Sequence, residues 1–78
     1  MSMNQKIADV ILSFKPGVDL ESSDDFIEDG IIDSFDVIAI VSEFNDAFDV
    51  EIGVLDLVPE NFKSIETLAA MITRLSDD

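Results

Sequence analysis

Apolar residues recur at three- and four-residue steps in three stretches of this 78-residue chain, which in each stretch places them on one face of a helix. The first stretch predicts a helix over residues 3–14. The second predicts a helix that begins at Ser34 and ends at Phe48, and the third predicts a last helix that follows Ser64 and ends near Asp77. The stripes consist of Met3, Ile7, Val10, Ile11 and Phe14; Val37, Ile40, Val41, Phe44 and Phe48; and Ile65, Leu68, Ala69, Ile72 and Leu75.

The connections between these helices differ in length and pattern. Residues 16–33 begin with Pro-Gly and mix acidic and apolar residues too irregularly for a helix or strand, so we expect a long loop whose apolar side chains pack onto the helices. After the second helix, we expect Ile52 to turn back to the core and Gly53 to release the chain, with a strand over residues 50–55 as the alternative. Pro59 then favours a short helical turn.

These elements predict an all-α protein, a small four-helix bundle with three main helices and one short helix. A chain of 78 residues suffices for a single domain, residues 1–78, and a hydrophobic content of 47% is enough for a small core. We therefore expect a compact module without disulfide or metal staples.

Charge and composition narrow the function. The chain has 18 acidic and 4 basic residues and a formal net charge of −14, which disfavours nucleic acid and anionic membranes as partners and favours proteins with basic docking surfaces. It has no cysteine and no histidine, so we expect neither catalytic nor metal-ligating residues. The first residues show no signal-peptide pattern and no apolar run is long enough to span a bilayer. We expect a cytoplasmic protein that its charge keeps monomeric.

The candidate functional site is the stretch of residues 29–36, where a loop meets the second helix. Asp33 followed three positions later by Asp36 predicts an N-cap with an acidic third helical residue. Ser34 then lies at the exposed, electropositive start of the helix. We interpret Ser34 as the functional residue. The alternative is that it only begins the helix, where serine is common.

Three further features each have a functional and a structural interpretation. Phe35 and Ile38 lie partly off the apolar stripe, where they form a docking patch or pack under the preceding loop. Asp46 and its acidic neighbours on the second helix belong to a recognition surface or to a solvated face. Residues 25–36 match an EF-hand loop in part, but Ile27 stands where an oxygen ligand is needed. We therefore expect weak divalent binding rather than a specific calcium site.

The order of a helix, a long acidic loop, Gly-Ile-Ile-Asp-Ser-Phe-Asp, a second helix, a short turn and a final helix resembles the acyl carrier protein family over nearly the whole chain. Asp33-Ser34-Phe35 stands where that family has its Asp-Ser-Leu attachment motif, and the Phe-x-x-x-Ile of Phe48 to Ile52 also matches. The resemblance implies that a separate phosphopantetheinyl transferase attaches 4′-phosphopantetheine from coenzyme A to Ser34. It also implies that the chain carries acyl or aminoacyl groups as thioesters and is not itself an enzyme.

The resemblance implies further partners as well, namely acyl-loading and acyl-processing enzymes of fatty-acid synthesis or of a specialised pathway. The candidate partner-recognition residues are Asp33, Phe35, Asp36, Ile38 and Asp46. An apolar helical bundle can also shelter an acyl chain, and the candidate lining residues are Ile52, Leu57, Phe62 and Leu68.

Some positions depart from the fatty-acid-synthesis pattern. Phe35 replaces the usual leucine and Gly-Ile-Ile at residues 30–32 replaces Leu-Gly-Ala, which brings the motif closer to D-alanyl carrier proteins and other specialised carriers. Ala39 stands where those carriers usually have a glutamate, and Glu43 where they have a small residue. Two other classes are alternatives: a small acidic interaction or ion-binding module without a prosthetic group, and a mimic of nucleic acid.

Overall fold

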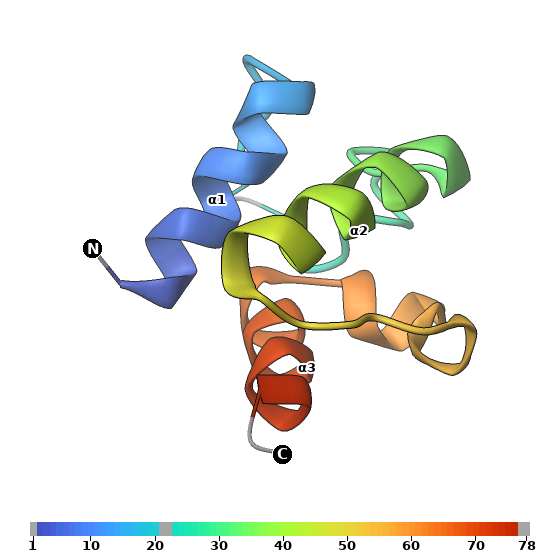
Figure 1. The fold of residues 1–78 in the computed structure, drawn as a ribbon. Coiled ribbons are helices and arrows are strands. Elements are labelled where there is room, and N and C mark those ends of the chain that lie inside the picture. Colours follow the sequence, from blue (N-terminus) through green and yellow to red (C-terminus); the bar gives the residue numbers. More distant parts are fainter. Residues whose placement is uncertain (1, 21–22, 77–78) are drawn as a thin grey trace.

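The computed structural model describes residues 2–20 and 23–76, and in these residues it contains helices and no strand. The elements in chain order are α1 (Met3–Phe14), α2 (Ser34–Phe48), the 3-10 segments η1 (Val54–Asp56) and η2 (Pro59–Phe62), and α3 (Ile65–Ser76). Figure 1 shows the three long helices meeting around a common centre, with α1 packed against both α2 and α3 and η2 packed against α3. The all-α prediction is confirmed.

The predicted short helix is present as two 3-10 segments rather than one. Pro59 begins η2, as its fixed backbone angle favours, and η1 precedes it. The alternative of a strand over residues 50–55 is wrong, since η1 occupies part of that stretch. The predicted end of the last helix near Asp77 lies outside the described residues.

Side chains cap the starts of α1 and α3. Ser2 Oγ accepts a hydrogen bond from the Gln5 N–H at 3.2 Å. At the start of α3, Ser64 Oγ accepts from the Thr67 N–H at 3.2 Å and Thr67 Oγ1 accepts from the Ser64 N–H at 3.0 Å. Each cap satisfies backbone donors that the first helical turn leaves without a partner.

The core draws on every helix and on the connections between them. Its buried apolar side chains are Ile7, Ile11, Phe26, Ile32, Ile40, Phe44, Ile52, Phe62, Leu68, Met71 and Ile72. No buried polar or charged residue is found among the described residues, so the apolar contacts alone define the centre of the bundle. The Cα radius of gyration is 11.4 Å, close to the value of about 11.5 Å expected for a compact chain of this length.

The long connection before α2 is held to the bundle by two buried residues, Phe26 and Ile32. Phe26 is fully buried, its N–H donates to the Lys63 carbonyl at 2.7 Å, and its carbonyl accepts from the N–H groups of Ile31 and Ile32 at 2.9 and 3.1 Å. The expectation that apolar residues fix this loop to the helices is confirmed. As a result, the part of the loop around Phe26 is fixed next to the junction of η2 and α3, and the chain runs from there to the start of α2.

The exit from α2 differs from the prediction in one respect. Ile52 is 8% exposed and belongs to the core, as expected. However, the residue with left-handed backbone is Asp49, at φ 54° and ψ 48°, whereas Gly53 has a φ of −98°. Asn45 supports this exit, because its Oδ1 accepts a hydrogen bond from the Ile52 N–H at 2.8 Å. Aspartate tolerates the left-handed region better than most residues, so glycine is not required at Asp49.

None of the helices in the described ranges is both long and apolar enough to cross a membrane.

Candidate functional site

Ser34 is the first residue of α2 and its side chain is exposed. The helix begins there because Asp33 is an N-cap of a complete capping box. Asp33 Oδ1 accepts from the N–H groups of Phe35 and Asp36 at 3.0 and 2.9 Å, and Asp36 Oδ2 accepts from the Asp33 N–H at 3.1 Å. This geometry confirms the predicted cap and fixes the backbone of Ser34 between its two halves.

The Ser34 hydroxyl makes no hydrogen bond to any other described residue. Most of the other described serines use their hydroxyl groups locally: Ser2, Ser13, Ser23, Ser64 and Ser76 each have a hydrogen-bond partner. Ser42, in the middle of α2, resembles Ser34 in having none, but it does not lie at a helix start. Ser34 therefore combines an available hydroxyl with the positive end of a helix dipole.

The charges beside Ser34 are held in a fixed arrangement. Lys15 Nζ lies 3.0 Å from Asp36 Oδ2. Partial burial raises the pKa of the Asp36 carboxyl, but the hydrogen bond from the Asp33 N–H and the Lys15 ammonium outweigh this effect, so the net pKa lies below its ordinary value. The hydrogen bond and the charge of Asp36 in turn raise the pKa of Lys15. Both groups are thus charged at neutral pH, and Asp33 adds an exposed carboxylate.

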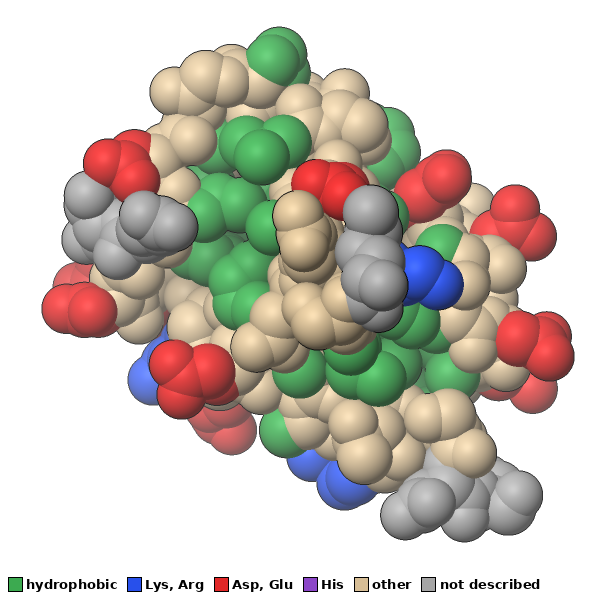
Figure 2. Space-filling model, turned by 90° about the vertical axis from the view of Figure 1, so that its left-hand side faces the viewer, with side chains coloured by type: hydrophobic (Ala, Val, Ile, Leu, Met, Phe, Trp, Pro, Cys, Tyr) green, Lys and Arg blue, Asp and Glu red, His purple; other side chains and the backbone are tan. Residues whose placement is uncertain are grey.

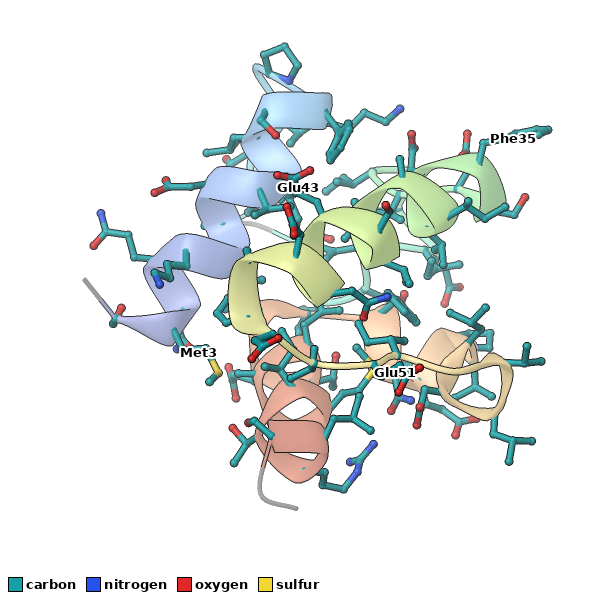
Figure 3. All side chains as sticks on the ribbon, in the orientation of Figure 1. Met3, Phe35, Glu43 and Glu51 are labelled. Carbon is teal, nitrogen blue, oxygen red and sulfur yellow. The ribbon has the colours of Figure 1, made fainter. Side chains whose placement is uncertain are left out.

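Apolar side chains stand exposed next to Ser34. Phe35 is 82% exposed and Ile38 is 67% exposed, so neither packs under the preceding loop. Figure 3 shows the Phe35 side chain projecting away from the bundle at the start of α2. The geometry is thus compatible with the predicted docking patch. Asp46 is exposed further along the same helix.

A pocket of about 360 Å³ borders Ser34. Apart from Ser34, its lining is apolar: Val37 and Ile38 come from α2, and Ile27 comes from the loop before it. The opposite wall comes from the segment between η1 and the end of η2, and consists of Leu57, Val58, Pro59 and Phe62. The pocket therefore lies between the start of α2 and the 3-10 segments.

The structure separates the four predicted acyl-lining residues into two pairs. Leu57 and Phe62 line the pocket beside Ser34. Ile52 and Leu68 do not line it and are buried in the core instead. Sequence reasoning missed the other lining residues from outside α2, Ile27, Val58 and Pro59. The only signal for them was that the stretch around Pro59 is more apolar than a solvated loop requires.

Two acidic residues of the long loop, Asp25 and Asp29, accept local hydrogen bonds. Asp25 Oδ1 accepts from the N–H groups of Ile27 and Glu28, both at 3.1 Å, and Asp29 Oδ2 accepts from the Ser23 hydroxyl at 2.6 Å. In the described part of the chain, no group of three or more acidic side chains is placed to hold a metal ion. These carboxylates shape the loop that precedes Ser34.

A larger groove lies elsewhere on the molecule. It has a volume of about 770 Å³, is lined by α1, the long loop and the start of α3, and is not bordered by Ser34. Its lining is mixed, with Leu12 and Phe26 beside Asp9, Asp24 and Glu66. Figure 2 shows one face of the protein, where acidic side chains lie around the edge and hydrophobic side chains are visible between them. The acidic residues that line this larger groove favour a basic partner rather than an anionic ligand.

A protein-family model matches most of the chain. The model of a protein family described as the phosphopantetheine attachment site matches residues 5–72, which include α1, α2, both 3-10 segments and most of α3. None of the curated proteins compared with the chain matches it.

Proposed function

Because this chain belongs to the phosphopantetheine attachment-site family of carrier proteins, we propose that Ser34 is its attachment residue and that the chain carries acyl or aminoacyl groups as thioesters. Domains of this family bear a covalent 4′-phosphopantetheine group. The group supplies a thiol, which this chain lacks because it has no cysteine. On this proposal, residues 1–78 form a single carrier domain that does no catalysis of its own.

The position of the Ser34 hydroxyl is the observation that carries the proposal. It is exposed, has no hydrogen bond in the described part of the chain, and lies at a helix start that Asp33 and Asp36 hold in place. A partner enzyme can therefore approach the hydroxyl without displacing a protein contact. Ser42 shares the free hydroxyl but neither the helix start nor the pocket, so it serves as a matched control.

The attachment reaction needs only a hydroxyl from this chain. Ser34 Oγ forms a bond to the phosphorus that bears the pantetheine, the bond between the two phosphates of coenzyme A breaks, and adenosine 3′,5′-bisphosphate leaves. The hydroxyl proton passes to a base on a phosphopantetheinyl transferase, which also holds Mg²⁺. The absence of histidine here is consistent with that division of labour.

Partner enzymes are expected to dock around the start of α2. Asp33, Asp36 and the exposed Asp46 offer negative charge, and Phe35 and Ile38 offer exposed apolar surface beside Ser34. A partner that presents Lys or Arg around an apolar contact would match this surface and associate rapidly at low salt. We propose that these enzymes belong to fatty-acid or specialised acyl synthesis in the cytoplasm, and that the carrier acts as a monomer.

Intact-mass measurement tests the attachment residue. Wild type, Ser34→Ala and Ser42→Ala are incubated with coenzyme A, Mg²⁺ and a broad-specificity phosphopantetheinyl transferase. We expect wild type and Ser42→Ala to gain one phosphopantetheine unit and Ser34→Ala to gain none, while all three keep the same helical circular dichroism. A gain on Ser34→Ala, or no gain on folded wild type, would refute the assignment.

A further inference from the structure

The pocket beside Ser34 is suited to a small apolar group. Val37 and Ile38 face Leu57 and Val58 across it, and Phe62, which is 1% exposed, joins it to the core. Ser34 contributes the single polar side chain among the residues that line it. Such a pocket favours a group of a few carbons and leaves polar groups at its rim, because they would lose water without gaining a hydrogen bond.

We propose that this pocket binds the pantoyl end of the phosphopantetheine arm, through the two methyl groups on its quaternary carbon. The inference rests on the proposed attachment at Ser34. Counting from Ser34 Oγ, that carbon is the first apolar branch of the arm, about four bonds away, or roughly 5 Å along an extended chain. Since Ser34 itself borders the pocket, this is the first group of the arm that can enter it.

The acyl cargo lies much further along the arm. Its sulfur is about fourteen bonds from Ser34 Oγ, roughly 17 Å along an extended chain. A pocket of about 360 Å³ would be only about 9 Å across if it were spherical. Between the dimethyl carbon and the sulfur, the arm carries a hydroxyl and two amides, for which the apolar walls offer no partner. The pocket therefore selects the dimethyl group and leaves the thioester end free for partner enzymes.

The walls of the pocket are held in place without the arm. The hydrogen bond from the Phe26 N–H to the Lys63 carbonyl, at 2.7 Å, ties the residue before Ile27 to the residue after Phe62. Phe26 and Phe62 are both buried in the core. Binding in a pocket that is already formed costs little ordering of the protein, so a group as small as a dimethyl carbon suffices to occupy it.

Nuclear magnetic resonance of the modified protein tests this inference. An unlabelled arm is installed on ¹³C-labelled protein, intact mass confirms complete modification, and isotope-filtered spectra report which side chains lie near the arm. We expect cross-peaks from the dimethyl protons to the methyl groups of Ile38, Leu57 and Val58. In Leu57→Asn these cross-peaks should lose most of their intensity. In Leu55→Asn, the same change at a residue that is 93% exposed and does not line the pocket, they should persist.

Two results on modified wild type would overturn the inference. One is the absence of cross-peaks between the dimethyl protons and the pocket. The other, in protein loaded with a hexanoyl group, is a set of cross-peaks from the acyl methyl group to Leu57 and Val58 in place of those from the dimethyl protons, which would assign the pocket to the cargo. Neither result touches the attachment at Ser34. If the attachment proposal itself were wrong, the intact mass of wild type would show no added phosphopantetheine, or Ser34→Ala would gain it as well, before any spectrum is recorded.

Discussion

Lys15 Nζ lies 3.0 Å from Asp36 Oδ2, which links the C-cap of α1 to the first turn of α2. The same carboxylate oxygen accepts the Asp33 N–H of the capping box. One of the 4 basic residues in the chain is therefore placed at the start of the helix that presents Ser34. Lys15 can position this helix start without contacting Ser34 itself.

This pair gives the stability a defined pH dependence. The pKa of Asp36 is lowered, so its contribution to stability is present above its ordinary value of 3.8 and is lost as the pH falls through the folded-state pKa. The pKa of Lys15 is raised, so its contribution is present below 10.5 and is lost as the pH rises above it. We expect Asp36→Asn to be less stable than wild type at pH 7, with a difference that shrinks at about pH 3.

Urea unfolding of both proteins at the two pH values measures this difference. Glu66→Gln, in the first turn of α3, is the control for loss of an exposed carboxylate without an ion pair in the described part of the chain. A difference between wild type and Asp36→Asn that is as large at pH 3 as at pH 7 would show that the Asp36 charge contributes nothing.

Asp33 has two roles that substitution can separate. Its carboxylate caps α2 through the Phe35 and Asp36 N–H groups, and it places negative charge beside Ser34. Asparagine is also a good N-cap, so Asp33→Asn should keep most of the stability, whereas Asp33→Ala should lose about 1 kcal/mol. If the basic surface of the transferase is attracted to the Asp33 carboxylate, Asp33→Asn should still lower kcat/KM for modification. This loss in kcat/KM should become smaller at high salt, because salt screens the attraction.

Transferase kinetics and urea unfolding of the two variants decide the question. Equal modification rates for Asp33→Asn and wild type at low salt would leave Asp33 with the capping role alone. A rate that falls only in Asp33→Ala, in step with its stability, would lead to the same conclusion.

Local sequence signals were enough to predict the helices and the start of the site. The apolar stripes located α1, α2 and α3, and the Asp33 and Asp36 pattern predicted the cap beside Ser34, because both depend on residues within one or two turns of each other. The left-handed residue at the α2 exit was missed, because Gly53 was the stronger local signal and Asp49 can adopt the same backbone.

Contacts between distant segments could not be predicted in the same way. The Lys15 to Asp36 ion pair and the Phe26 to Lys63 hydrogen bond join residues whose separation follows no helical or strand period. The pocket depends on such contacts, since Ile27 and Val58 reach it only once the loop and the 3-10 segments are packed together. The sequence could therefore indicate Ser34, but not the shape of the surface beside it.

Substitution by alanine should affect the stability of the fold at one phenylalanine of α2 and the binding of partners at another. Phe44 is fully buried, and its ring lies edge-on to that of Phe48 at 5.8 Å, so Phe44→Ala should cost roughly 3–5 kcal/mol of unfolding free energy. Phe35 is 82% exposed, so Phe35→Ala should change stability by no more than about 0.5 kcal/mol. If Phe35 is a docking contact, its loss should weaken partner binding by about 1 kcal/mol or more.

Denaturant unfolding and affinity for a partner enzyme, measured on both variants, test this pair. A stability loss for Phe35→Ala comparable to that of Phe44→Ala would contradict its exposed position. Unchanged affinity in stable Phe35→Ala would remove Phe35 from the docking surface.

Added salt should stabilise the protein, although it weakens the Lys15 to Asp36 pair. An ion pair near the surface, with its Lys15 and Asp36 side chains 33% and 19% exposed, contributes little, whereas 18 acidic residues against 4 basic ones repel one another throughout the surface. We therefore expect the Tm to rise with NaCl at pH 7, and to rise with millimolar MgCl₂ as well. Since 1 kcal/mol corresponds to about 4–8 °C in a domain of this size, even a modest relief of repulsion is measurable. In acid, where protonation of the carboxylates brings the net charge toward zero, the salt dependence should become smaller. A Tm that stays flat or falls with salt at pH 7 would mean that self-repulsion does not limit the stability of this fold.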